Sequence, residues 1–216
     1  MMRIGLLGGT FDPVHDGHLQ LALAAKNELS LDNVLLIPAA SPPHKCNREV
    51  TSFHHRREML LLALVGTRGL TPCFIEGELP TPSYTIDTIR ILQKQDDTPV
   101  EYFFIIGVDA FADLLTWKEY EELLRRVRLI VARRKGFSAL DKLDEIAVTL
   151  DYEQLPDLWR SRSGFKDILF LRSQPRQISS SLVRRLLTSG VACVPGVRQE
   201  VVDYAMHHHL YIAESS

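Results

Sequence analysis

Two histidines close to the N-terminus have the side-chain type and spacing that suit phosphate chemistry. His15 and His18 stand three residues apart in the segment 8–19, which reads GGTFDPVHDGHL. The glycine pair at its start lets the backbone approach a ligand closely. A helix that begins just before His18 would present unpaired N–H groups and the positive end of its dipole. Because residues three apart share one helix face, we expect a polyphosphate site built from backbone donors and two imidazoles.

Other chemistries for this segment fit less well. A structural zinc site needs four ligands, and no cysteine or carboxylate stands at ligand spacing beside the two histidines. A turn with incidental histidines is a good interpretation of a lone histidine, but not of a pair joined to a Gly-Gly turn. The patterns GxGxxG and GxxxxGK[ST] are both absent. Ordinary dinucleotide binding and P-loop binding are therefore disfavoured.

The elements that must position these residues follow from the hydrophobic pattern. Apolar runs predict strands at 4–7, 34–37, 73–76, 100–106, 129–132 and 168–171. Segments of helical period predict helices at 18–29, 56–65 and 84–95, and the part from 181 to 211 is expected to be helical with a break at Pro195-Gly196. Continuous apolar strands indicate a sheet covered on both faces. Their alternation with helices predicts a parallel, doubly wound α/β sheet, with ligands at the carboxyl ends of its strands.

The composition narrows the function classes. A net charge of −2 over 216 residues gives no general attraction to nucleic acid. The three cysteines show no CxxC spacing and form an odd set, which favours a reducing compartment. No apolar run is long enough to span a membrane. We expect one domain, residues 1–216, in the cytoplasm; the sequence leaves the oligomeric state open, and a homo-oligomer is compatible with it.

The first segment resembles a known signature. GGTFDPVHDGHL is similar to the HxGH motif of the nucleotidylyltransferase superfamily, in the form found in bacterial nicotinate-nucleotide adenylyltransferases. Four further elements resemble that family in its own order: PPHK at 42–45, PSYTIDT at 82–88, IGVD at 106–109 with Trp117, and ISSSLVR at 178–184. The likeness covers nearly the whole chain. Three positions depart from the family pattern, namely Ser181 for Thr, Val183 for Ile and Lys135 where the family often has Pro.

The resemblance implies a Rossmann-like, doubly wound, mainly parallel α/β sheet followed by a C-terminal helical segment at about 179–211. It implies an enzyme that transfers the adenylyl group of ATP to nicotinate mononucleotide, giving deamido-NAD and pyrophosphate for NAD biosynthesis. The implied partners are these two nucleotides, without nucleic acid or membrane. Mg²⁺ is the expected cofactor, carried on the ATP phosphates with part of its water shell, and the sequence does not identify protein ligands for the metal.

The resemblance also implies residue roles. The reacting phosphates are expected to contact His15, His18 and Arg184. ATP binding is expected from the first loop, the strand end near 107 and the start of the last helical part, that is Gly8, Gly9, Thr10, Phe11, Gly107, Asp109, Ile178, Ser179, Ser180 and Ser181. Nicotinate mononucleotide binding is expected from Lys45, Ser83, Tyr84, Thr85, Trp117 and Arg134.

Several of these residues also have plainer interpretations. Arg184 and Lys45 are compatible with solvated surface cations, Trp117 with core packing and Asp109 with a helix cap. The helix that opens at Ser83-Tyr84-Thr85 leaves its first N–H groups unpaired. Those donors fit a carboxylate better than an amide, which brings its own NH₂ group. We therefore expect a preference for nicotinate over nicotinamide.

Two alternative functions stay open at this stage. The first is another HxGH nucleotidylyltransferase that acts on nicotinamide mononucleotide or on pantetheine phosphate; the SYT element and Trp117 favour the nicotinate enzyme over the pantetheine one. The second, from a different class, is a non-catalytic nucleotide-binding protein of the same fold. The presence of both histidines and Arg184 favours an enzyme. Release of pyrophosphate, as opposed to ATP binding alone, distinguishes the two classes.

Overall fold

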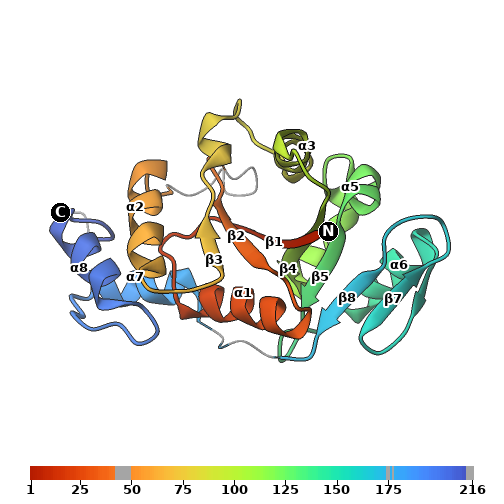
Figure 1. Cartoon of the computed structure of the whole chain (residues 1–216). Helices are drawn as coiled ribbons and strands as arrows, with labels where there is room; N and C mark the ends of the chain where they lie inside the picture. The colour runs from red at the N-terminus through yellow and green to blue at the C-terminus, as the bar shows by residue number, and fades with distance from the viewer. Residues whose placement is uncertain (42–49, 174–175, 177, 213–216) are drawn as a thin grey trace.

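A computed structural model describes residues 1–41, 50–173, 176 and 178–212. Within them, eight strands form one sheet in the order β3-β2-β1-β4-β5-β8-β7-β6 (Figure 1). The strands are β1 (Met2–Gly9), β2 (Asn33–Pro38), β3 (Leu70–Pro72), β4 (Val100–Gly107), β5 (Arg128–Ala132), β6 (Tyr152–Gln154), β7 (Leu158–Ser161) and β8 (Ile168–Leu171). The pairs from β3 to β8 are parallel, and β7 and β6 extend the edge in antiparallel fashion. The predicted mainly parallel α/β sheet is confirmed.

Helices cover both faces of this sheet. They are α1 (Asp16–Glu28), α2 (Phe53–Leu64), α3 (Thr85–Gln95), α4 (Val108–Phe111), α5 (Tyr120–Arg126), α6 (Leu140–Thr149), α7 (Ser180–Thr188) and α8 (Gln199–His207). Two short 3₁₀ turns are η2 (Ile75–Glu78) and η3 (Leu114–Thr116). In Figure 1, α1 and α7 lie below the sheet and α3 and α5 above it. Within the described residues, no helix is long and apolar enough to cross a membrane.

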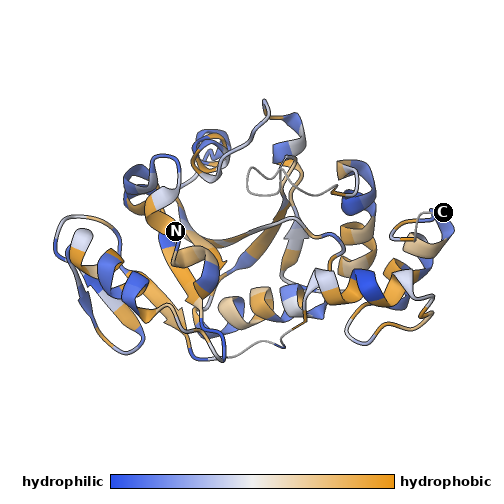
Figure 2. Cartoon of the chain, turned by 180° about the vertical axis from the view of Figure 1, so that it is seen from behind, coloured by the Kyte–Doolittle hydropathy of each residue, from blue (hydrophilic) through white to orange (hydrophobic). Residues whose placement is uncertain are grey.

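The strands alternate their side chains between two separate cores. In β4, Phe104 and Ile106 belong to a core shared with α3, α5 and α6. Phe103 and Ile105 belong to the opposite core, shared with α1, α2, α7 and α8. Figure 2 shows the strands mostly apolar and the helices with one apolar and one polar face. Each such side chain, once fully buried, contributes about 1.5–3 kcal/mol, so continuous apolar strands are stable only with helices on both sides.

The strand order reverses between β1 and β4. From β1 the chain continues outward through β2 and β3, and from β4 through β5 in the other direction. β1 and β4 pair directly, with Leu7 beside Ile105. Their carboxyl ends therefore open side by side onto Gly8 and Gly107. In doubly wound sheets, this reversal leaves a crevice that binds ligands.

Two local predictions differ from the structure. Residues 73–76 were expected to form a strand, but β3 lies earlier, at Leu70–Pro72, and Ile75–Glu78 is a 3₁₀ turn. The turn brings the Glu76 carboxylate into the interior, where it accepts hydrogen bonds from Ser83 and Thr88. The C-terminal helical part is confirmed, although its break is longer than Pro195-Gly196, since α7 ends at Thr188 and α8 begins at Gln199. The sequence pattern did not predict α6, β6 or β7.

Candidate active site

The two motif histidines lie at the beginning of α1 and hold each other in place. The backbone N–H of His15 donates to Nδ1 of His18 at 3.3 Å. Their rings stack, with centroids 3.7 Å apart and an interplanar angle of 17°. Phe11 is buried and has a positive φ of 49°. Its ring and that of His18 meet edge to face, with centroids 4.9 Å apart. Since Nδ1 of His18 accepts a hydrogen bond, Nε2 carries the proton of the neutral ring.

His15 is the more deeply buried member of the pair, with 6% of its surface exposed. Burial lowers its pKa to about 4, against the smaller raising effects of its own backbone and of Asp16. Within the described residues, its buried Nδ1 atom has no hydrogen-bond partner. A Cβ atom on Gly17 would lie 3.0 Å from that Nδ1 and 3.1 Å from the carbonyl oxygen of Arg176. A side chain at position 17 would therefore push against the His15 ring and the Arg176 backbone. The lowered pKa leaves His15 neutral at pH 7.

The beginning of α7 docks onto the loop that follows β1. Ser179 caps the helix by accepting from the N–H of Leu182 at 3.2 Å. Ser180 Oγ donates to the carbonyl oxygen of Pro13 at 3.0 Å. Arg184, whose side chain is 15% exposed, donates to the carbonyl oxygen of Asp12 at 2.5 Å and to Ser181 Oγ at 2.9 Å. These contacts bring the guanidinium of Arg184 to the same loop as the histidines.

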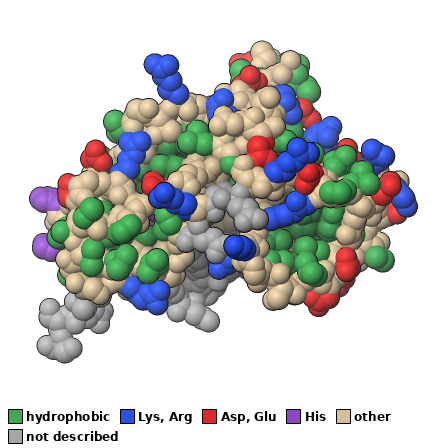
Figure 3. Space-filling model, turned by 90° about the horizontal axis from the view of Figure 1, so that it is seen from below, with side chains coloured by type: hydrophobic (Ala, Val, Ile, Leu, Met, Phe, Trp, Pro, Cys, Tyr) green, Lys and Arg blue, Asp and Glu red, His purple; other side chains and the backbone are tan. Residues whose placement is uncertain are grey.

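The histidines and Arg184 line one cavity of about 740 Å³. It lies where the carboxyl ends of β1, β4 and β5 meet α1 and α7. Its lining contains His15, Gly17, His18, Leu21, Gly107, Val108, Asp109, Ala132, Arg133, Arg134, Lys135, Arg176, Ile178, Ser179, Ser180, Ser181, Leu182 and Arg184. Five of these side chains are cationic and one is a carboxylate, so the cavity suits a polyanion. Figure 3, which shows the molecule from below, has several Lys and Arg side chains near the middle of the visible face.

Gly107 and Asp109 occupy the β4 side of this cavity. A Cβ atom on Gly107 would meet nothing within 4 Å, so its Cα faces open space that a planar ligand can fill. The carboxylate of Asp109 accepts from Arg134 Nη1 at 2.9 Å. Gly107, not Asp109, is the N-cap of α4. Arg134 was expected beside nicotinate mononucleotide, whereas in the structure it lines the same cavity as the residues expected to bind ATP.

Three of the six residues expected to bind the acceptor lie above the sheet, at the beginning of α3. Tyr84 is the extended N-cap and Thr85 the first helical residue. Ser83 is buried, and its Oγ donates to Glu76 Oε2 at 2.7 Å. Trp117 follows η3 and packs half-buried against Phe104, with ring centroids 6.1 Å apart in an edge-to-face arrangement. Trp117 is thus partly packed into the core and partly accessible.

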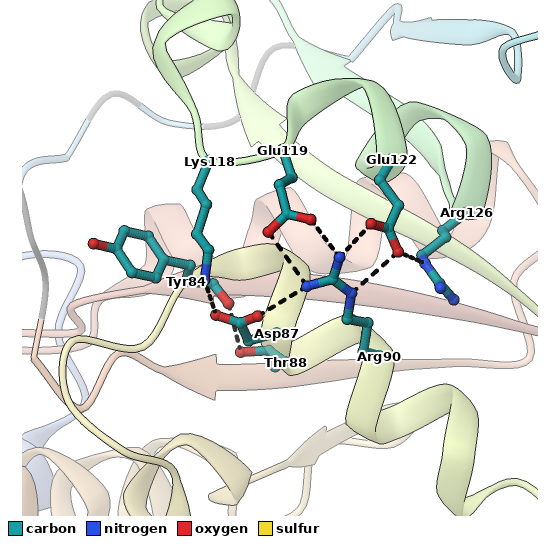
Figure 4. A network of polar contacts seen from close by, with 8 residues as sticks. All are labelled: Tyr84, Asp87, Thr88, Arg90, Lys118, Glu119, Glu122 and Arg126. Carbon is teal, nitrogen blue, oxygen red and sulfur yellow. Dashed lines mark hydrogen bonds and ion pairs between the residues drawn. The ribbon is translucent and has the colours of Figure 1, made fainter.

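A charged network ties the Trp117 segment to α3 (Figure 4). Lys118 lies 4.6 Å from the centre of the Tyr84 ring and donates to Asp87 at 2.9 Å. Arg90, on α3, donates hydrogen bonds to Glu119, the N-cap of α5, and to Glu122 within α5. Hydrogen bonds from Arg90 and then Arg126 lower the pKa of Glu122 to about 2. The network keeps Tyr84 and the residue next to Trp117 in contact.

A small cavity of about 30 Å³ lies between the end of β1 and the beginning of α3. Gly8, at the end of β1, lines it together with Thr85 and Thr88 of α3 and with Glu76. Gly8, near the end of β1, thus lies beside the beginning of α3, while the segment after β1 contributes His15 to the large cavity.

Lys45, which was expected in the site, falls in the segment 42–49, outside the described residues. Three further residues line the large cavity although the motifs did not predict them, namely Arg133, Lys135 and Arg176. The basic run directly after β5 was a usable signal for the first two, since carboxyl ends of strands face the ligand. Glu76 gave no signal, because its partners follow only from the fold.

Comparisons with known proteins agree with this geometry. Residues 6–186 match the cytidylyltransferase-like family model. The chain is 40% identical to a probable nicotinate-nucleotide adenylyltransferase of Desulfotalea psychrophila, over 98% of this chain and 100% of that one. It is 39% identical to the protein of the same name from Pelobacter propionicus, over 97% and 98% of the two chains.

Solved structures share the fold. The Plasmodium falciparum nicotinic acid mononucleotide adenylyltransferase in complex with NaAD superimposes with a TM-score of 0.73 at 19% identity, covering 98% of both chains. The same enzyme in complex with APC gives a TM-score of 0.67, also at 19% identity and over 98% of both chains. One conclusion follows from the shared family model, the full-length identity and the clustering of the motif residues. The chain belongs to the cytidylyltransferase-like family and, within it, to the nicotinate-nucleotide adenylyltransferases.

Proposed function

We propose that this protein transfers the adenylyl group of ATP to nicotinate mononucleotide, producing deamido-NAD and pyrophosphate. The observation that carries the proposal is the convergence of His15, His18 and Arg184 on one cavity. Arg184 is far from the two histidines in sequence, and the lining around all three is cationic. The full-length relatives named as nicotinate-nucleotide adenylyltransferases support the same reaction.

The reaction is an in-line displacement at the α-phosphorus of ATP. An oxygen of the acceptor's 5′-phosphate forms the new P–O bond, and the bond from the α-phosphorus to the bridging oxygen of pyrophosphate breaks. The attacking group is already an anion, so no enzyme nucleophile or general base is required. Catalysis then consists of positioning two anions and stabilising the charge on the transferred group and on pyrophosphate.

The cavity residues suit these tasks. His18 presents a protonated Nε2 atom, fixed by the backbone bond to its Nδ1, as a donor toward the α-phosphoryl oxygens. The N-terminus of α7, capped by Ser179, offers backbone donors to a phosphate together with Ser180 and Ser181. Arg184 adds a planar guanidinium that fits phosphate oxygens. Arg133, Lys135 and Arg176 supply further positive charge for the leaving pyrophosphate.

The remaining ATP contacts are assigned to backbone and ribose-binding groups. Gly8, Gly9, Thr10 and Phe11 provide the loop along which the phosphates lie. Gly107 leaves room for the adenosine, and Asp109, held by Arg134, accepts from a ribose hydroxyl. This assignment moves Arg134 from the acceptor to the ATP side. ATP enters as its Mg²⁺ complex, in which the metal neutralises phosphate charge and keeps part of its water shell.

The acceptor binds at the beginning of α3. The Ser83 hydroxyl donates a hydrogen bond to Glu76. We therefore propose that Ser83 shapes the loop and does not contact the pyridine. The unpaired N–H groups at Tyr84 and Thr85 receive the nicotinate carboxylate. Trp117 provides the stacking surface for the ring. Lys45 is proposed as a phosphate contact from the loop after β2.

Pyrophosphate release tests the function directly. The purified protein is incubated with ATP and Mg²⁺ and, in turn, nicotinate mononucleotide, nicotinamide mononucleotide or pantetheine phosphate. The expected result is release that depends on the acceptor and is fastest with nicotinate mononucleotide. Equal kcat/KM for the two pyridine nucleotides would refute the acid preference. ATP binding without pyrophosphate release would instead support the non-catalytic alternative. A cytoplasmic location and a homo-oligomer remain predictions.

A further inference from the structure

A charged side chain lies buried beneath the active-site loops. Arg56, on α2, is 1% exposed, although arginine is among the residues least often buried. Four of its N–H groups donate to backbone carbonyl oxygens: Nε to Thr51 at 2.8 Å, Nη1 to Thr10 at 2.9 Å and to Ala39 at 2.7 Å, and Nη2 to Ala40 at 3.3 Å. A guanidinium has five such donors in a rigid fork, so this one is nearly saturated by backbone.

The acceptors belong to two loops that flank neighbouring strands. Thr10 lies in the loop after β1, which holds the proposed ATP phosphate contacts. Ala39 and Ala40 follow β2 directly, and Ala39 N–H donates to the carbonyl oxygen of Gly9 at 2.8 Å. Arg56 therefore fixes the end of β2 relative to the end of β1 through its own hydrogen bonds.

The same chain of contacts continues to the beginning of α3. The N–H of Ala40 donates to Glu76 Oε2 at 3.3 Å, while its carbonyl oxygen accepts from Arg56. Glu76, itself buried, accepts from Ser83 Oγ at 2.7 Å and from Thr88 Oγ1 at 3.1 Å. One residue, Ala40, thus separates the buried cation from the buried anion. The connection runs from the proposed ATP loop to the proposed acceptor site.

Simple core packing does not account for this arrangement. Burying a charge is costly, and apolar residues of similar volume often stabilise a core as well or better. Burial lowers the pKa of Arg56, whereas the charges of Asp12, Tyr211 and Glu76 raise it. Lysine cannot replace the fork, because its three donors leave from a single nitrogen. What arginine supplies here is a fixed distance between several carbonyl groups.

We infer that Arg56 is a positioning residue for adenylyl transfer, which acts through Thr10 on the ATP phosphates and through Ala40 and Glu76 on the acceptor. It touches neither substrate. The inference rests on the proposed function, because it assigns Arg56 to the alignment of those two substrates. Alignment affects the transition state more than the binding of either nucleotide alone, and a misplacement of about 1 Å costs on the order of 100-fold.

The test compares Arg56→Lys with Arg57→Lys, the same substitution at the next residue of α2. Arg57 is exposed and contacts Glu58 and the Phe74 ring. The measurements are kcat, both KM values and thermal unfolding. We expect Arg56→Lys to fold and to lose about 10- to 100-fold in kcat, with each KM within threefold of the native value, and Arg57→Lys to behave as native. A folded Arg56→Lys protein with kcat within threefold of native overturns the inference.

A second variant decides the question if Arg56→Lys does not fold. Glu76→Gln keeps Arg56 but replaces one carboxylate oxygen with an NH₂ group. That group would face donors from which Glu76 now accepts hydrogen bonds, namely the hydroxyls of Ser83 and Thr88 or the N–H of Ala40. We expect kcat to fall at least tenfold with both KM values within threefold of native; native-like kcat would overturn the inference. Failure of the proposed function is distinguishable, because then the native protein itself would release no pyrophosphate.

Discussion

The two motif histidines differ in burial and in what they offer a ligand. His15 is buried with a pKa lowered to about 4, so it is neutral under ordinary conditions. His18 has its Nδ1 atom occupied by a backbone N–H, which leaves Nε2 as the ring nitrogen available to donate. A neutral His15 avoids the desolvation cost of a buried charge. Arg184, Arg176 and the basic run after β5 supply the positive charge instead.

Removal of the His18 ring is expected to affect the chemical step. His18→Ala should lower kcat by about 10²–10³-fold, the scale for loss of one donor that stabilises charge in a transition state. KM for ATP should change much less. The matched control is His54→Ala, since His54 is exposed at the beginning of α2, away from the cavity. Steady-state kinetics with pyrophosphate detection measure both; unchanged turnover in His18→Ala would remove this residue from the mechanism.

Burial of His15 makes stability depend on pH. The unfolded chain binds a proton at a pKa of 6.5, whereas the folded chain binds it only at about 4. Between these values the unfolded state holds more protons, so stability falls as the pH is lowered through this window. From pH 7 to pH 5 the contribution of His15 is a loss of about 2 kcal/mol in the free energy of unfolding.

Urea unfolding of the native protein and of His15→Gln at pH 7 and pH 5 measures this contribution. Other groups titrate in both proteins, so their effects cancel in the comparison. The native protein should lose about 2 kcal/mol more than the variant on acidification. Equal losses would mean that the imidazole of His15 ionises in the folded protein as easily as in water.

At the scale of elements, the beginning of α3 determines the proposed acid preference. Thr85 is the first helical residue and Tyr84, before it, is extended with φ −110° and ψ 149°. Proline is tolerated at the first position of a helix, and it requires an extended residue before it. Thr85→Pro can therefore delete one unpaired N–H group while the helix stays in place.

We expect Thr85→Pro to reduce discrimination between the acid and amide mononucleotides. A hydrogen bond to a charged group contributes about 1.5–3 kcal/mol, so the ratio of the two kcat/KM values should fall about 10- to 100-fold. Thr85→Ala, which keeps the N–H group, serves as the control and should leave the ratio nearly unchanged. The same loss in both variants would assign the selectivity to the Thr85 side chain instead of the backbone.

Elements also show how far sequence reasoning extends. The parallel strands other than β3 and helices α1 to α3 were predictable, because continuous apolar runs and helical periodicity report burial directly. The run at 73–76 was assigned to a strand, since a short apolar run has no periodicity of its own. Its actual form depends on Glu76, whose partners Ser83 and Thr88 come later in the chain. The short antiparallel strands β6 and β7 carry mixed polar residues and gave no pattern.

At the scale of the whole molecule, the large cavity joins four distant parts of the chain. Residues 15–18, 107–109, 132–135 and 176–184 contribute to its lining. The motifs and their order were predictable, whereas their distances depend on the strand order and on how α7 docks. The C-terminal segment closes this arrangement, because the N–H of Asp16 donates to the carbonyl oxygen of Gly196 at 2.8 Å. Arg134 illustrates the limit, since its motif alone did not indicate that it lines the cavity of the histidines and bonds to Asp109.

The contact between Tyr211 and Asp12 joins the two ends of the described chain. Tyr211 donates to Asp12 Oδ1 at 2.6 Å, and its carbonyl oxygen accepts from Thr188 Oγ1 at 2.6 Å. Asp12 is 2% exposed, and its backbone holds Arg184. Tyr211→Phe leaves this buried carboxylate with one donor fewer. The expected loss is about 1.5–3 kcal/mol in the free energy of unfolding and ~10-fold in kcat through displacement of Arg184.

Tyr204→Phe is the matched control, because it removes a hydroxyl that lies 2.9 Å from His55 Nδ1 on the α2–α8 contact, away from the catalytic loop. It should cost about 0.5–1.5 kcal/mol and leave kcat unchanged. Urea unfolding and pyrophosphate release on both variants separate a local effect on α8 from an effect on the first loop. If the two variants lose equal stability and both retain native kcat, the contact of Tyr211 with Asp12 has no influence on the active site. If only Tyr211→Phe loses kcat, as predicted, the last described segment helps to position the loop that follows β1.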